Sequence, residues 1–187
     1  GRSVGAAGAV AGLMARIDAA QGLWKAPAGT RAELQGVEAL DLLLSAPVIE
    51  RLGLLGINPL RAQGGSLRVW GARTLAGEGE WTYVAVRRLG LYLQRSIEAG
   101  TRWASFEPSD EPLWSALRQV VGAFLQELFR AGAFAGARPE EGYFVRCGAD
   151  TTTPADRAAG RAHLSVGFAP LRPGEFLILR LALATAA

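Results

Sequence analysis

The chain has 187 residues, 50% of them hydrophobic, and a formal charge of +3 at pH 7 from 20 basic and 17 acidic side chains. A chain of this length and apolar content can bury a substantial core, which argues against disorder. The small basic excess is spread along the chain, so it argues against nucleic-acid binding while still favouring contact with an acidic protein partner.

The start of the sequence predicts short elements joined by loops. Gly1–Gly8 is rich in small residues and predicts a flexible arm. The apolar stripe in Val10–Ala20 predicts an amphipathic helix, and Pro47–Gly56 predicts a second, shorter one. Between them, Trp24–Arg31 has the composition of a loop, and Glu33–Leu44 has features of both strand and helix.

The middle of the chain predicts strands that alternate with helices. Ser66–Leu75 has a strand pattern, Trp81–Gly100 has a helix pattern, and Thr101–Pro108 has the aromatic, β-rich composition of a buried strand. The next helix opens at Ser109 or Asp110 and carries a stripe of apolar residues: Leu113, Trp114, Leu117, Val120, Val121, Phe124, Leu125, Leu128 and Phe129. This order of elements predicts a sheet covered by helices.

The end of the chain predicts three strands, at Tyr143–Cys147, Ala162–Leu171 and Gly174–Leu183. The polar segment Thr151–Arg161 predicts a loop with one helical turn. We therefore expect an α/β fold with a mixed sheet flanked by two long helices, and with terminal arms available for strand addition between subunits. The expected divisions are a flexible arm at 1–8, an α/β domain at 9–173 and a C-terminal linking strand at 174–187.

Chemistry that needs several histidines or cysteines is excluded by count. His163 is the single histidine and Cys147 the single cysteine, so a Cys/His zinc site and an intrachain disulfide are impossible. Strand patterns surround both residues, which predicts an ordinary strand histidine and a small buried thiol. No GxxxxGK phosphate loop occurs. We expect no catalytic residue, no metal and no cofactor.

No segment has the roughly 18 to 20 apolar residues that a membrane helix needs. The Gly/Ala-rich start has a faint likeness to a signal peptide, but Asp18 and the stripe of Val10, Leu13, Met14 and Ile17 favour an amphipathic helix. We expect a soluble protein with no signal peptide and no membrane insertion.

Three carboxylates cluster at Glu107, Asp110 and Glu111. Paired carboxylates serve acid–base catalysis when one of them is desolvated, so a small α/β enzyme or ligand-binding module with a cleft near Glu107–Glu111 is the alternative function. Capping of the following helix explains the same residues without a substrate, and we favour it.

Several other residues are candidates for contacts with a partner surface. Arg87, Arg88 and Arg95 can present a basic helix surface, although an ordinary solvated face explains them equally well. Asp110 and Glu111 form an acidic counterpart. Trp24 beside Lys25 in a loop suggests an interface role, because tryptophan is common in binding hot spots.

The last strand is apolar and ends the sequence. Such a strand is suited to pairing with the sheet of a neighbouring subunit, and the residues expected to do so are Phe176, Leu177, Ile178, Leu179, Arg180 and Leu181. Ser3 and Val4 of the N-terminal arm are candidates for a second link. The alternative is that Phe176–Leu183 completes the chain's own sheet. In the linking case, deletion of Gly174–Ala187 is expected to leave a folded domain that cannot polymerise.

The motifs resemble one family across nearly the whole chain. GAVAGLMARIDAAQGLWKAPAG (Gly8–Gly29), GINPLR (Gly56–Arg61), RVWGARTL (Arg68–Leu75), EGYFVRCG (Glu141–Gly148) and PLRPGEFLILRL (Pro170–Leu181) occur in the order found in contractile tail sheath proteins. Together with the segment WTYVAVRRLGLYLQRSIEAGTRWASFEPSDEPLW, they resemble the C-terminal domain of that family, which occurs in phage tails, contractile bacteriocins and related injection systems.

The resemblance implies a structural role without nucleotide or metal. Sheath subunits stack as six-membered rings around an inner tube, then rearrange into a shorter, wider state that drives the tube into a target envelope. The implied partners are other copies of the chain, the inner tube protein, and baseplate and tail terminator proteins, with no nucleic acid. The implied location is a phage tail or an injection particle assembled in the cytoplasm. The family's C-terminal domain is the inner layer, so the resemblance implies tube contacts here. The expected contacts are the helix that carries Arg87, Arg88 and Arg95, or the acidic helix start at Asp110.

Overall fold

A computed structural model describes residues 3–186, and the chain folds as two compact units, residues 1–89 and 90–187. The first unit contains helix α1 (Ala7–Gln21), helix α2 (Ala46–Leu54) and strands β1 (Leu60–Gln63) and β2 (Ser66–Val69). Helix α3 (Val84–Gly100) begins in the first unit and continues into the second.

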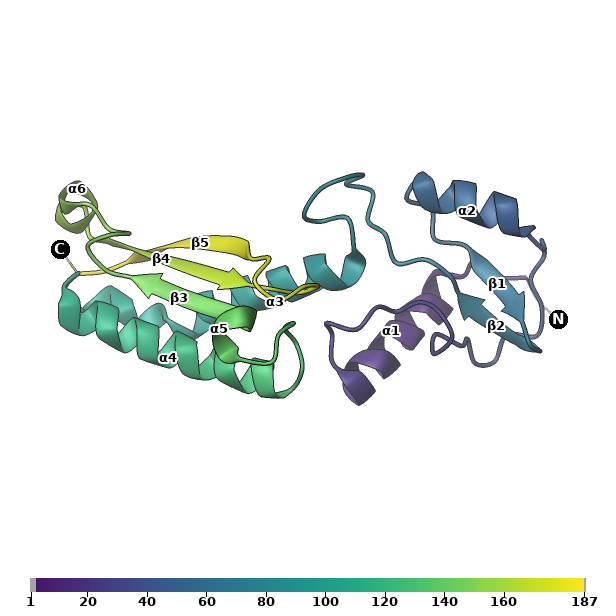
Figure 1. Ribbon diagram of the computed structural model, residues 1–187, viewed down its shortest axis with the longest axis horizontal. Helices are drawn as coiled ribbons and strands as arrows, with labels where there is room; N and C mark the ends of the chain where they lie inside the picture. Colours follow the sequence, from purple (N-terminus) through teal and green to yellow (C-terminus); the bar gives the residue numbers. More distant parts are fainter. Residues whose placement is uncertain (1–2, 187) are drawn as a thin grey trace. The chain divides into compact units, whose positions relative to one another are not determined.

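Strands β1 and β2 form an antiparallel hairpin, coloured blue in Figure 1. Gly64 and Gly65 close it with φ values of 60° and 78°, the left-handed conformation that a two-residue hairpin turn requires. The first unit's buried cluster forms where α1 places Leu13 and Ile17 against Leu34 and Val69.

A second pairing in the first unit precedes α3. Thr74 donates its N–H to the carbonyl of Thr82 at 2.8 Å, and Val84 donates to Ala72 at 2.9 Å. The Thr82 hydroxyl also donates to the carbonyls of Gly77 and Gly79. The loop between the paired segments, residues 75–80, is exposed at every position.

The second unit contains a three-stranded sheet, coloured green to yellow in Figure 1. Its remaining elements are the 3₁₀ helix η1 (Arg102–Phe106), α4 (Glu111–Arg130), α5 (Pro139–Gly142), β3 (Tyr143–Cys147), α6 (Pro154–Ala158), β4 (Arg161–Phe168) and β5 (Leu177–Ala184). The strand order is β3-β4-β5, and both pairings are antiparallel.

Helix α4 covers one face of this sheet, as Figure 1 shows. The predicted apolar stripe supplies its buried residues, including Leu117, Val121 and Leu125. Alternate residues of β4 point to the same core, and Leu164, Val166 and Phe168 are at most 1% exposed. The apolar face of α4 repeats every 3.6 residues and that of β4 every 2 residues, and both patterns are present in the sequence.

The prediction of one mixed sheet is wrong, since the named strands form two separate antiparallel sheets. A parallel pair needs a long crossover, usually a helix, whereas β1 and β2 are joined directly by the Gly64–Gly65 turn. The expected strand at Thr101–Pro108 is instead the 3₁₀ helix η1. The carbonyl of Ile97 accepts hydrogen bonds from both the N–H and the hydroxyl of Thr101, at 2.9 and 2.7 Å, and this continues helical turns past α3. The coarser prediction, an α/β chain of helices and small sheets, is confirmed.

Several boundaries also differ. The expected strand Ser66–Leu75 ends at Val69, and its partner β1 was missed because four residues give too short a pattern. Helix α1 begins at Ala7, so the end of the expected flexible arm is helical, while Gly1 and Arg2 lie outside the described residues. The strand at Tyr143–Cys147 is confirmed.

Candidate functional site

The carboxylates near the start of α4 have structural partners. Asp110 is the N-cap of α4 and accepts a hydrogen bond from the Leu113 N–H at 3.2 Å. Glu111 forms an ion pair with Arg118 of the same helix. The capping interpretation is therefore confirmed, and it accounts for two of the three residues on which an acid–base site near Glu107–Glu111 would depend.

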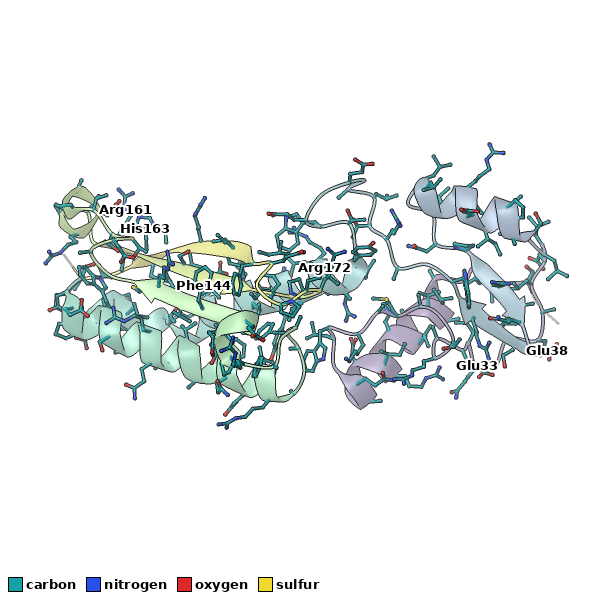
Figure 2. The ribbon with its side chains drawn as sticks, in the orientation of Figure 1. Glu33, Glu38, Phe144, Arg161, His163 and Arg172 are labelled. Carbon is teal, nitrogen blue, oxygen red and sulfur yellow. The ribbon has the colours of Figure 1, made fainter. Side chains whose placement is uncertain are left out.

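His163 and Cys147 both lie in the three-stranded sheet, as their patterns predicted. The Nε2 atom of His163 lies 3.3 Å from Oδ1 of Asp156, which caps α6 together with Thr153. Figure 2 shows His163 and Arg161 at the end of the sheet next to α6. Cys147 is 2% exposed, and burial raises the pKa of its thiol to about 11, so the thiol is protonated at neutral pH.

The three candidate arginines of α3 have different environments. Arg88 donates Nη1 to Oδ1 of Asp18 at 2.9 Å and Nη2 to the other carboxylate oxygen, so its charge is used inside the first unit. This ion pair raises the pKa of Arg88 further above its ordinary value. The guanidinium of Arg87 lies 5.0 Å from the ring centre of Trp81, and Arg95 is exposed. Arg87 and Arg95 remain candidates for outside contacts.

The other candidates of the first unit lie in its loops. The ring of Trp24 packs over Gly22, where an added Cβ would lie 2.3 Å from a ring atom, and Lys25 is exposed. Ser3 donates its hydroxyl to Asp41 at 2.8 Å, while Val4 is 77% exposed. Trp24 is thus partly committed to its own unit, and Lys25 and Val4 are accessible.

The proposed linking segment lies mostly within β5. All eight residues of β5 are in register with β4, from Leu177 opposite Phe168 to Ala184 opposite Arg161. Leu181 and Leu183 are buried, and Phe176 stacks edge-on against Phe144 with ring centres 5.1 Å apart. The segment therefore completes the chain's own sheet, which was the alternative interpretation. β3 and β5 are the outer strands of the sheet.

Sequence reasoning missed the sheet face opposite the buried one, which we call the outer sheet face. Register places the side chains of Phe144, Gly167 and Ile178 in one row on this face, and those of Arg146, Ser165 and Arg180 in the next row. The Phe144 ring covers Gly167, where an added Cβ would lie 2.1 Å from a ring atom. Figure 2 shows Phe144 on this sheet.

The first unit exposes a cluster of apolar side chains beyond the end of α2. Leu54 and Leu55 are 74% and 70% exposed, and Ile57 is 47% exposed. Leu75 is 88% exposed and lies next to Gly56. A cavity of about 760 Å³ in the same unit is lined by residues 3–6 and 9, residues 34 and 36–42, and Leu44 and Leu60. Neither feature contains the residues expected for the enzyme alternative.

Within residues 3–186, no group of three or more His, Cys, Asp and Glu side chains is placed to hold a metal ion. No helix in the same range has the length and apolar character needed to span a membrane.

Comparison with known proteins identifies what these units are similar to. Residues 2–75 match the family model of the phage tail sheath protein central domain. A putative prophage major tail sheath protein of Pseudomonas aeruginosa (strain UCBPP-PA14) is 26% identical over 182 residues, which are 93% of this chain and 44% of that protein. The predicted resemblance to sheath proteins is confirmed, but residues 2–75 match a model of the central domain and not the C-terminal domain that was predicted for them.

Solved structures give the same result. A chain in the cryo-EM structure of the anti-feeding prophage baseplate matches with a TM-score of 0.81 and 34% identity, over 92% of this chain and 48% of that one. A chain in the contracted sheath complex of an extracellular contractile injection system, PVC, matches with a TM-score of 0.80 and 35% identity, over 92% and 49%. The chain therefore spans about half the length of the relatives that it matches.

Proposed function

This chain is a relative of contractile tail sheath proteins, and we propose that it is a structural subunit of a contractile sheath. In this proposal the subunit polymerises helically around an inner tube and contracts to drive the tube through a target envelope. The observation that carries the proposal is the match of both units, over 92% of the chain, to chains in a baseplate and a contracted sheath complex. Its location would be a phage tail or an injection particle.

The partners follow from the same proposal. Other copies of the chain would form six-membered rings stacked into a helix, and the inner tube, baseplate and tail terminator proteins would contact the sheath. The outer strands β3 and β5 support strand addition, because each has a neighbour in the sheet on one side only. A strand from a second copy could add there through backbone hydrogen bonds, while β5 stays in its own sheet.

Electron microscopy of the protein expressed with and without its candidate tube partner tests the proposed function. We expect helical tubes, in long and short forms when the tube partner is present. Discrete particles under every condition would contradict the proposal. Within tubes, a strand of one copy beside β3 or β5 of another would support strand addition, and edges without such a strand would contradict it.

Arg87 is the candidate tube contact whose charge is not matched inside the described part of the first unit. Since Trp81 holds its guanidinium through a cation–π contact, the Arg87→Glu substitution changes the charge of a positioned group. We expect slower tube-templated assembly, with an effect that shrinks as salt rises. Arg88→Glu is not a matched test, because it also breaks the ion pair with Asp18. Equal assembly rates for Arg87→Glu and the parent at low salt would contradict this contact.

A further inference from the structure

The outer sheet face of the second unit has exposed positive charge that the described residues do not neutralise. Arg146 and Arg180 are both exposed, and neither lies within ion-pair distance of a carboxylate in residues 3–186. The guanidinium of Arg146 lies 5.1 Å from the ring centre of Phe144, which holds it above the sheet. The face therefore has two exposed cations without counter-charges among residues 3–186, and Phe144 positions one of them.

The spacing of these cations follows from the sheet. Arg146 on β3 and Arg180 on β5 are both opposite Ser165 on β4. Adjacent strands lie about 4.8 Å apart, so the two arginines leave the sheet roughly 10 Å from each other. The neighbouring row is apolar, with Phe144 and Ile178, the latter 47% exposed. A complementary partner would present two carboxylates beside one apolar side chain.

The chain carries such a group in the loop at residues 75–80. Leu75 is 88% exposed, and Glu78 and Glu80 are exposed and form no ion pair among residues 3–186. The backbone pairing of residues 72–74 with 82–84 holds both ends of the loop, and the Thr82 hydroxyl binds two of its carbonyls. The loop thus presents an apolar group and two charges from a fixed base.

We propose that loop 75–80 of one copy docks on the outer sheet face of a second copy. Glu78 and Glu80 pair with Arg146 and Arg180, and Leu75 packs against Phe144 and Ile178. The inference rests on the proposed assembly of this chain into a sheath. Because the loop and the face are different surfaces, the contact is heterologous, and it links copies head to tail in a ring or a helix rather than in a two-fold dimer. Charge complementarity sets the orientation of successive copies.

Charge reversal in two separate chains tests this contact. The loop variant carries Glu78→Arg and Glu80→Arg, and the face variant carries Arg146→Glu and Arg180→Glu. Each variant alone places like charges together, so we expect its critical concentration for assembly to rise about tenfold or more. An equimolar mixture restores opposite charges at every contact between the two variants. We expect the mixture to assemble near the parent's concentration, as measured by sedimentation and electron microscopy.

Other outcomes would overturn the proposal. Normal assembly of either variant alone would show that the contact does not form. Failure of the mixture to assemble would also overturn it. That result is expected if the outer sheet face binds another acidic partner, such as nucleic acid, instead of the loop. Recovery only in a chain that carries all four changes, without recovery of the mixture, would contradict a contact between copies.

Two controls keep the result interpretable. Arg102→Glu changes an exposed arginine of η1 that is in neither surface, and it should assemble like the parent. Thermal unfolding of each variant identifies a folding defect, which mixing cannot repair. Failure of the parent to assemble under any condition would count against the proposed function itself, whereas assembly of the parent without rescue of the variants would count only against this contact.

Discussion

The two units differ in the length of their strands, the extent of their buried cores and the number of ion pairs among their described residues. The second unit has strands of up to eight residues and a continuous buried row through Leu164, Val166 and Phe168. Its described residues, 90–186, also contain five arginine–carboxylate ion pairs. The first unit has strands of four residues and, among its described residues, the single ion pair of Arg88 with Asp18. The net charge of +3 lies in the first unit, since residues 90–187 hold ten basic and ten acidic side chains.

This difference indicates which surfaces are candidates for contact with another protein. Soluble monomers seldom expose large apolar clusters, and such clusters mark interaction sites. The exposed Leu54, Leu55 and Leu75 form such a cluster in the first unit, and the second unit also exposes large apolar side chains, with Phe106 84% and Leu171 60% exposed. A subunit whose neighbours complete its burial would show this pattern. Unfolding of variants in each unit tests whether the second unit has the more extensive core.

The largest effect is expected from deletion of residues 174–187. The deletion removes β5, and with it the buried Leu181 and Leu183 and the partner of β4 along eight residues. We therefore expect the second unit to lose its cooperative unfolding transition, as measured by circular dichroism and denaturant titration. This corrects the expectation that the truncated chain stays folded. A sharp transition with the parent's midpoint would mean that β5 is dispensable for this unit.

Core truncations in the two units should differ next. Phe168→Ala removes a fully buried ring, and we expect a loss of about 3–5 kcal/mol in the free energy of unfolding. Leu13→Ala lies in the small cluster of the first unit, which can relax more easily, and we expect about 2–3 kcal/mol. Denaturant unfolding of both variants measures the difference. A larger loss for Leu13→Ala would reverse the comparison.

The smallest effect concerns acid stability of the second unit. A hydrogen bond from Thr153, followed by one from His163, holds the pKa of Asp156 below its ordinary value. A carboxyl with a lowered pKa in the fold stabilises it above the unfolded pKa of about 4, and this contribution disappears as pH falls through the folded value. Asp156→Asn should therefore be less stable than the parent at pH 7, and the difference should shrink as pH falls through the lowered pKa of Asp156.

Unfolding midpoints across that pH range check the prediction. Glu141, whose pKa is lowered mainly by a hydrogen bond from the Ala137 N–H, keeps its own contribution in both proteins and serves as an internal reference. A difference between Asp156→Asn and the parent that stays constant from pH 7 into the acid range where the carboxyl is protonated would show that the carboxylate's charge is not responsible.

Sequence patterns predicted the elements that depend on local order. The cap at Asp110 and the apolar stripe of α4 are confirmed, except that Val120, which was placed in the stripe, is 46% exposed. The strand predicted at Thr101–Pro108 was wrong. Aromatic and β-branched residues favour strands, but the conformation of this segment depends on the preceding helix.

Long-range partners could not be read from local patterns. Arg88 finds Asp18 70 residues away, and Arg146 shares a row with Arg180 only once the register of three strands is known. One signal was available in the sequence. In both strands the side chains alternate between the two faces of the sheet, and each arginine lies at a position between core residues. Once the strands are assigned, this alternation places both arginines on the outer sheet face.

Hydrogen exchange of the free chain and of assembled tubes tests most directly whether the open surfaces are those that assembly covers. We predict that the amides of residues 52–57 and 75–80 gain protection in tubes, while those of β4 are already protected in the free chain. Equal exchange of residues 52–57 and 75–80 in both states would contradict the account, because the open surface of the first unit would then have no neighbour.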